Sequence, residues 1–129
     1  MLLLELFVPG ALRNPLNGSL SRAHWTVKSK WANEWKAKTV AAMMHAPATI
    51  PTTYHAPFTE IPKLIRFIAN TGSTWDDDNL PAAIKPIRDA LIGYVIHSDA
   101  PDSGHVFTYA QRVDRKRRGV RITVKAPGL

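Results

Sequence analysis

The segment from Lys63 to Asn70 constrains the fold most, because it has the pattern of a strand buried in the middle of a sheet. Alternate residues of a strand point to opposite faces. The residues expected on the two faces are Ile65, Phe67 and Ala69, and Leu64, Arg66 and Ile68. Since both faces are largely apolar, we predict a central strand with a neighbour on each side.

Three further segments have strand character. Leu2–Val8 is a short apolar stretch that ends at Pro9-Gly10. Val106–Val113 and Val120–Val124 flank the basic segment Asp114–Gly119, so we predict that they pair as a hairpin with a basic tip. The sheet would then contain about four strands.

Two segments are predicted to be helical. Thr26–Met44 lacks Pro and Gly, and Trp31 and Trp35 recur on one helical face opposite several lysines, which favours a place in the core for both rings. The second helix is expected over Leu80–Ile92. Pro86 lies inside it, so we expect a kink or two short helices that meet there.

The other segments are typical of connections. Gly10–Ser21 is expected to be a surface loop, and the proline-punctuated stretch His45–Thr59 an irregular connection. Gly93 should end the second helix, and Tyr94–Ile96 should form an extended stub. Together, these strands, helices and connections predict one α+β domain over residues 1–129, with a small mixed sheet packed against two main helices.

Length and composition favour a single cytoplasmic domain. With 129 residues and 14.3 kDa, the chain supplies one ordinary core. It has no cysteine, so disulfides and thiolate metal sites are excluded. The apolar run Met1–Leu4 is broken by Glu5 and is too short for a secretion signal, and no segment approaches the roughly 20 apolar residues of a membrane span.

The net charge of +7 is unevenly distributed. Eight basic residues face three acids from Met1 to Arg66, and seven face Asp114 alone from Arg112 to Leu129. Between Phe67 and Gln111, two basic residues face six aspartates. Because acids weaken binding to a polyanion, an acidic cluster in a basic chain suggests a divalent cation.

Three aspartates are the candidate ligands. Asp76 and Asp78 lie two apart, so on an extended chain both point to the same side, and Asp99 follows the second helix, where the chain returns. Carboxylate oxygens suit Mg²⁺, for which Mn²⁺ is a plausible substitute, and such an ion can activate water against a phosphodiester. Lys85 is the nearby cation that could stabilise charge in the transition state.

A structural role for these acids is the alternative. Asp78 could cap the following helix, while Asp76 and Asp77 favour its positive end. One cap accounts for one aspartate, whereas the chain has three in a row before Asn79.

The order of these motifs resembles the RusA-type Holliday junction resolvases. The resemblance rests on Trp75-Asp76-Asp77-Asp78-Asn79-Leu80, then Lys85 and Asp89-Ala90-Leu91, then an apolar stub and Asp99. It covers roughly residues 61 to 124. In that family a strand delivers an Asp-x-Asp-Asn-Leu motif, a helix with Lys and Asp-Ala-Leu follows, and an acidic pair closes the site.

Carried over to this chain, the resemblance implies that Asp76, Asp78 and Asp99 bind Mg²⁺ and that Lys85 is the catalytic cation. It also implies a RusA-like fold and a homodimer that makes paired cuts in four-way DNA junctions during recombination and repair. Members of the family are common in phages and prophages.

Two positions depart from the family pattern. The closing acidic pair is Ser98-Asp99 here, so Asp77 or Asp102 would have to replace one carboxylate. The gap from Asn79 to Lys85 is about one helical turn longer than in the best-known member.

Basic residues near the C-terminus are the predicted DNA contacts. They are Arg112, Arg115, Lys116, Arg117, Arg118 and Arg121, with Lys125 beside them. Beside an acidic metal site they favour phosphate binding over a merely solvated turn. The five histidines lack ligand spacing and are expected to be ordinary loop or strand residues, with His97 near the site.

Two other functions fit the same residues. The chain could be a non-catalytic DNA-binding accessory protein, in which the basic segment matters and the aspartates only cap. It could also be a metal-dependent nuclease for other branched substrates. The sequence does not identify the surface of a homodimer, although a two-fold dimer would match the two-fold symmetry of a junction.

Overall fold

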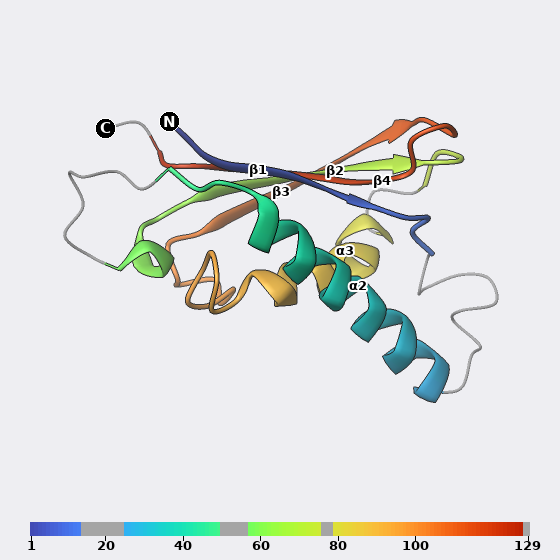
Figure 1. Cartoon of the computed structure of the whole chain (residues 1–129), viewed down its shortest axis with the longest axis horizontal. Helices are drawn as coiled ribbons and strands as arrows, with labels where there is room; N and C mark the ends of the chain where they lie inside the picture. The colour runs from blue at the N-terminus through green and yellow to red at the C-terminus, as the bar shows by residue number, and fades with distance from the viewer. Residues whose placement is uncertain (14–24, 50–56, 76–78, 128–129) are drawn as a thin grey trace.

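The computed structural model of the chain describes residues 1–13, 25–49, 57–75 and 79–127. These ranges form an α+β arrangement of one four-stranded mixed sheet and two α-helices, as predicted (Figure 1). The elements, in chain order, are β1 (Leu2–Pro9), α2 (Trp25–His45), the 3-10 turn η1 (Phe58–Glu60), β2 (Leu64–Thr71), α3 (Asn79–Leu91), β3 (Val106–Val113) and β4 (Gly119–Lys125).

Strand β2 occupies the interior of the sheet, which confirms the prediction of a central strand. The strand order is β1-β4-β2-β3. Strand β4 runs antiparallel to both β1 and β2, and β3 runs parallel to β2. Phe67 of β2 therefore lies between Ile122 of β4 and Tyr109 of β3.

The predicted hairpin is wrong, because β2 lies between the two strands that were expected to pair. The reason is the crossover through α3, which returns the chain to the beginning of β2 and allows β3 to pair in parallel with it. Residues 114–118 then pass across the end of β2 to reach β4. The basic segment therefore connects β3 and β4, two strands that are separated in the sheet by β2.

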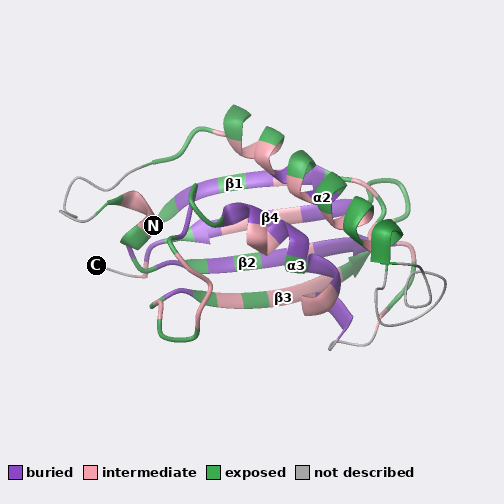
Figure 2. Ribbon diagram, turned by 90° about the horizontal axis from the view of Figure 1, so that it is seen from below, coloured by how far each residue is buried: buried purple, intermediate pink, exposed green. Residues whose placement is uncertain are grey.

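Both helices lie on the same side of the sheet (Figures 1 and 2). The side chains that fill the space beneath them include Ile65, Phe67 and Ala69 of β2, all buried. The opposite face of β2 carries the exposed Leu64 and Arg66, so the helices cover only one face of this strand.

Helix α2 follows the predicted segment closely and packs through its tryptophans. Trp35 is buried, as predicted, whereas Trp31 is only partly buried against the same core. Thr39 is also buried, and its hydroxyl donates to the carbonyl of Trp35 at 2.8 Å, which removes an unpaired polar group from the core.

Helix α3 is one continuous helix, so the alternative of two short helices is wrong. Pro86 lies inside it and is buried. Its apolar face carries Leu80, Ala83, Ile84, Ile87 and Leu91, all buried against the sheet and α2. Burial of this face outweighs the hydrogen bond that Pro86 cannot donate.

The segment after α3 is a compact turn rather than the extended stub that the sequence predicted. The carbonyl of Leu91 accepts from the backbone N–H groups of Tyr94, Val95 and Ile96, at 3.1, 2.8 and 3.2 Å. Gly93 has a φ of +91°, a conformation that other residues rarely adopt. No helix within the described ranges is long and apolar enough to cross a membrane.

The aromatic ring of Phe67 provides a test of this core. It is fully buried and stacks on Tyr109 and Phe107, at centroid distances of 5.4 and 6.4 Å. Phe67→Ala should lower the free energy of unfolding by about 3–5 kcal/mol in urea denaturation. Leu64→Ala, on the uncovered face of the same strand, should cost no more than about 1 kcal/mol. Equal losses would contradict the assignment of one buried face.

Candidate functional site

The chain reaches the acidic run by turning back after β2. The hydroxyl of Thr71 donates to the carbonyl of Ser73 at 2.8 Å and so holds the turn. Asp76, Asp77 and Asp78 lie outside the described residues, so the predicted ligands at 76 and 78 cannot be placed. Their described neighbours are Trp75 on one side and Asn79, the first residue of α3, on the other.

Gln111 of β3 holds the backbone immediately before Asp76. Its side-chain Oε1 accepts from the backbone N–H of Trp75 at 2.8 Å, and its Nε2 donates to the carbonyl of Trp75 at 2.6 Å. The side-chain amide thus pairs with both backbone groups of one residue, as a neighbouring strand would. This pairing fixes where the chain enters residue 76.

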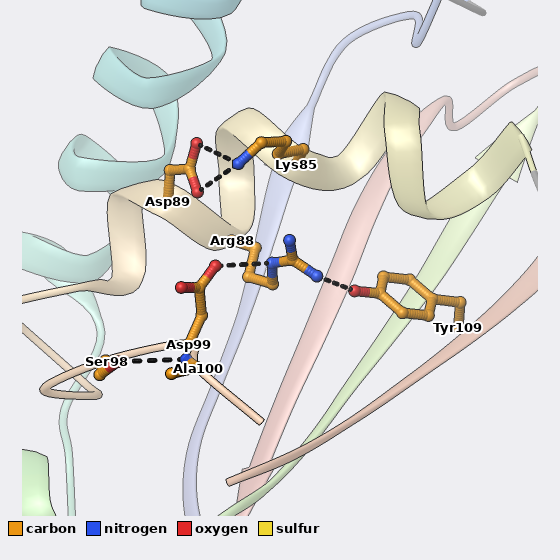
Figure 3. Close-up of polar contacts among 7 residues, drawn as sticks. All are labelled: Lys85, Arg88, Asp89, Ser98, Asp99, Ala100 and Tyr109. Carbon is orange, nitrogen blue, oxygen red and sulfur yellow. Dashed lines mark hydrogen bonds and ion pairs between the residues drawn. The ribbon is translucent and has the colours of Figure 1, made fainter. Parts of the chain in front are cut away.

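Asp99 contacts a cation from α3. Its Oδ2 lies 3.3 Å from Nε of Arg88, and Nη1 of Arg88 donates to the hydroxyl of Tyr109 at 2.9 Å (Figure 3). The Nε–H of Arg88 does not meet hydrogen-bond geometry, so its contact with Asp99 is an ion pair held by charge alone. Both side chains retain solvent contact, with 23% exposure for Arg88 and 29% for Asp99.

The two contacts lie next to each other on one face of β3. Tyr109 and Gln111 are two residues apart, so their side chains leave the same side of the strand about 7 Å apart. One supports the Arg88–Asp99 pair, and the other holds Trp75. Strand β3 therefore contacts both the Arg88–Asp99 pair and the backbone before Asp76.

Lys85 lies elsewhere on α3. Its ammonium contacts the two carboxylate oxygens of Asp89, both at 3.3 Å, and its side chain is 59% exposed. It lines a groove between α2 and α3 that also contains Trp31. Of the two cations on this helix, Arg88 is the one that contacts Asp99 (Figure 3).

The described part of the chain contributes one of the three predicted ligands. Within it, no group of three or more His, Asp or Glu side chains lies close enough to hold a metal ion. The hydroxyl of Ser98 accepts from the backbone N–H of Ala100 at 3.1 Å, so this residue shapes the turn beside Asp99. A complete metal site would need carboxylates from residues 76–78.

The basic connection 114–118 is tied to the end of β2. Nδ2 of Asn70 donates to the carbonyl of Arg117, and Nε of Arg115 donates to the carbonyl of Gly72, both at 3.0 Å. Asp114 Oδ1 accepts from the backbone N–H groups of Lys116 and Arg117 at 3.1 Å and curls the connection. The basic side chains are thus held beside the turn that leads to Asp76.

The exposed cations in this region differ in how freely they can meet a polyanion. Arg115, Lys116, Arg117 and Arg118 are all exposed, as is Arg112. Arg121 pairs with Glu5 at 2.9 Å, which partly compensates its charge. The guanidinium of Arg118 lies so close to Gly72 that a Cβ there would clash with it, and Arg117 stacks over the ring of Phe7.

Two residues of this region were not predicted from the sequence. Gln111 shares the helix-facing side of β3 with Phe107 and Tyr109, and a polar residue in such a row is a signal that it has a specific partner. Arg88 is the only arginine in the acidic segment, but nothing in its spacing indicates Asp99 as its partner. Comparison with protein-family models, with curated proteins and with solved structures found no match for this chain.

Replacing Gln111 tests the link between β3 and the acidic run. Gln111→Leu keeps similar bulk but leaves the N–H and carbonyl of Trp75 without their partner, so it should cost about 1–3 kcal/mol of stability. Hydrogen exchange at the Trp75 amide should accelerate more than exchange elsewhere in the sheet. Thr108→Leu, on the other face of β3, is the matched control. Unchanged protection of Trp75 would show that the side chain does not hold this segment.

Proposed function

We propose that this protein is a Mg²⁺-dependent, structure-selective DNA endonuclease that cuts four-way junctions in recombination and repair. The proposal includes Asp76, Asp78 and Asp99 as metal ligands, a homodimer as the active form and a cytoplasmic location. The motif order that resembles the RusA-type resolvases motivates it. The fold and the described contacts are compatible with it.

The observation that carries the proposal is the arrangement on β3. Tyr109 supports the pair of Arg88 and Asp99, while Gln111 two residues later fixes Trp75. Two neighbouring side chains on one face of β3 therefore contact the Arg88–Asp99 pair and the backbone that leads to Asp76. Convergence of the three predicted ligands would need both segments on this face of β3.

The chain's own residues would divide the work as follows. The carboxylates of Asp76, Asp78 and Asp99 would hold a hard cation, which supplies charge neutralisation and a more acidic water when bound. Arg88 now pairs with Asp99, and its guanidinium would be available to contact a phosphate oxygen when Asp99 instead serves as a ligand. Lys85 is the alternative cation, and its exposed pair with Asp89 leaves its ammonium free to move.

The basic connection would position the DNA. Because Arg115 is bound to Gly72 and Arg117 to Asn70, the exposed cations would contact the phosphates on either side of a strand that enters the site. A two-fold homodimer would supply a second site for the opposing strand of a junction.

Cleavage of a synthetic four-way junction tests the proposal directly. Wild-type protein should cut it with Mg²⁺ and not after chelation, and Asp78→Asn should lower the rate by at least about 10³-fold while the protein remains folded. Glu34→Gln, on the exposed side of α2, is the control for loss of one negative charge. Asp77→Asn and Asp102→Asn identify which acid, if either, completes the ligand set.

Binding without cutting would overturn the endonuclease and favour the DNA-binding accessory protein, which needs the basic connection alone. Preferential cutting of flaps or other branches in competition with the junction would instead correct the substrate. Comparing Arg88→Gln with Lys85→Gln decides the cation, because the catalytic one should lower kcat with little change in junction affinity.

The salt dependence of binding tests the DNA surface separately from catalysis. Replacing Arg117 and Arg118 by Gln should weaken junction binding and reduce the slope of log K against log salt by about one unit per lost phosphate contact. Lys30→Gln with Lys36→Gln removes the same charge from α2 and should leave the slope nearly unchanged. An identical slope in the arginine variant would remove the connection from the DNA surface.

A further inference from the structure

A pair of histidines and a backbone carbonyl face one another beside the start of β3. Nδ1 of His97 lies 3.2 Å from Nε2 of His105 and 3.0 Å from the carbonyl oxygen of Thr59. The two rings meet edge to face, with centroids 5.0 Å apart. His97 Nδ1 therefore lies close to two further atoms that can each donate a lone pair.

The three residues come from separate parts of the chain. Thr59 belongs to η1, His97 follows the turn after α3, and His105 directly precedes β3. The backbone N–H of His97 donates to the carbonyl of Thr59 at 3.0 Å and fixes the first two relative to each other. His105 is 6% exposed, whereas His97 is exposed to solvent. One histidine is therefore fixed in the core, and the other is accessible to a ligand from solvent.

A single proton on His97 Nδ1 does not satisfy both of its contacts. One proton on Nδ1 of His97 can point well at Thr59 or at His105, but not at both. Without that proton, the nitrogen and the carbonyl oxygen face each other with lone pairs. Nδ1 of His105 is buried and has no partner among the described residues. A metal ion differs from a proton in that several lone pairs can share it.

We propose that His97 Nδ1, His105 Nε2 and the Thr59 carbonyl oxygen form a binding site for a divalent transition-metal ion of the zinc class. Ligand atoms about 2.0–2.1 Å from a tetrahedral ion lie roughly 3.3 Å apart, close to the two separations found here. Imidazole suits Zn²⁺, Cu²⁺ and Ni²⁺, whereas Mg²⁺ prefers oxygen ligands. Water would complete the coordination on the open side.

The groups around the site both favour and oppose metal binding. Burial, followed by the charges of Lys63 and His97, lowers the pKa of His105 to about 4, so its ring stays neutral, the form that binds metal. The ammonium of Lys63 opposes a second cation nearby. However, burial lowers the pKa of Lys63 to about 8, and its Nζ donates to the carbonyls of Phe58 and Ile61, which moderates that repulsion.

Such a site would share no ligand with the proposed nuclease centre, although His97 lies two residues before Asp99. It uses no residue of the acidic run, and it would cross-link η1, the segment that carries Asp99 and the start of β3. Because the metal would bind the folded chain, it should raise the unfolding temperature, and further as the free metal concentration rises above its dissociation constant.

Zn²⁺ titration of tag-free protein tests the inference. Isothermal calorimetry in excess Mg²⁺ should find one Zn²⁺ per chain, with the same affinity in Asp78→Asn. His97→Ala should weaken binding at least about tenfold, since even outer partners of a metal site contribute that much. His45→Ala, which removes an exposed histidine at the end of α2, should bind as wild type does. With Cu²⁺ as the probe, electron paramagnetic resonance should detect two imidazole nitrogens, and one after His97→Ala.

The outcomes separate this inference from the nuclease proposal. Absence of stoichiometric Zn²⁺ binding, or equal binding by His97→Ala, would overturn the histidine site whatever the cleavage assay gives. Loss of Zn²⁺ binding in Asp78→Asn would also overturn it, because the ion would then occupy the acidic run. Because His97 is exposed, its replacement tests the site without disturbing the core.

Discussion

The pairing of β2 along both of its edges is the interaction on which the structure depends. A strand with two neighbours satisfies its backbone groups on both sides, and here one neighbour is antiparallel and the other parallel. The parallel neighbour requires a crossover, which α3 provides while covering the buried face that contains Phe67. The positions of α3, β3 and the connections at both ends of the sheet follow from this arrangement.

Strand β3 carries the polar side chains that position the candidate site. As an edge strand it has one half-buried face under α3, where Tyr109 and Gln111 make polar contacts that a fully apolar row could not make. Those contacts hold Arg88 with Asp99 and the backbone before Asp76. Polar groups at the margin of the core are well suited to such a role. Partial burial strengthens their hydrogen bonds, while the remaining contact with solvent lets them exchange partners.

The two ends of the sheet have different chemical characters. At the end where β2 finishes, the basic connection is bound to Asn70 and Gly72, so positive charge gathers beside the turn that follows this strand. At the opposite end, the buried Lys63 and the pair of His97 and His105 surround η1. A polyanion would therefore be recognised at the end where β2 finishes, and a transition-metal ion at the opposite end.

The sequence by itself determined the elements that local pattern controls: the central strand, the helix from about Thr26 to Met44 and the α+β class. Strand order and partners were decided only by tertiary structure, because two strands adjacent in sequence can also be separated by a third when a helix crosses over. The same holds for the sites. Sequence spacing drew attention to Asp99, but its contact with Arg88 and the meeting of His97 with His105 depend on side chains brought together by the fold, which no periodicity encodes.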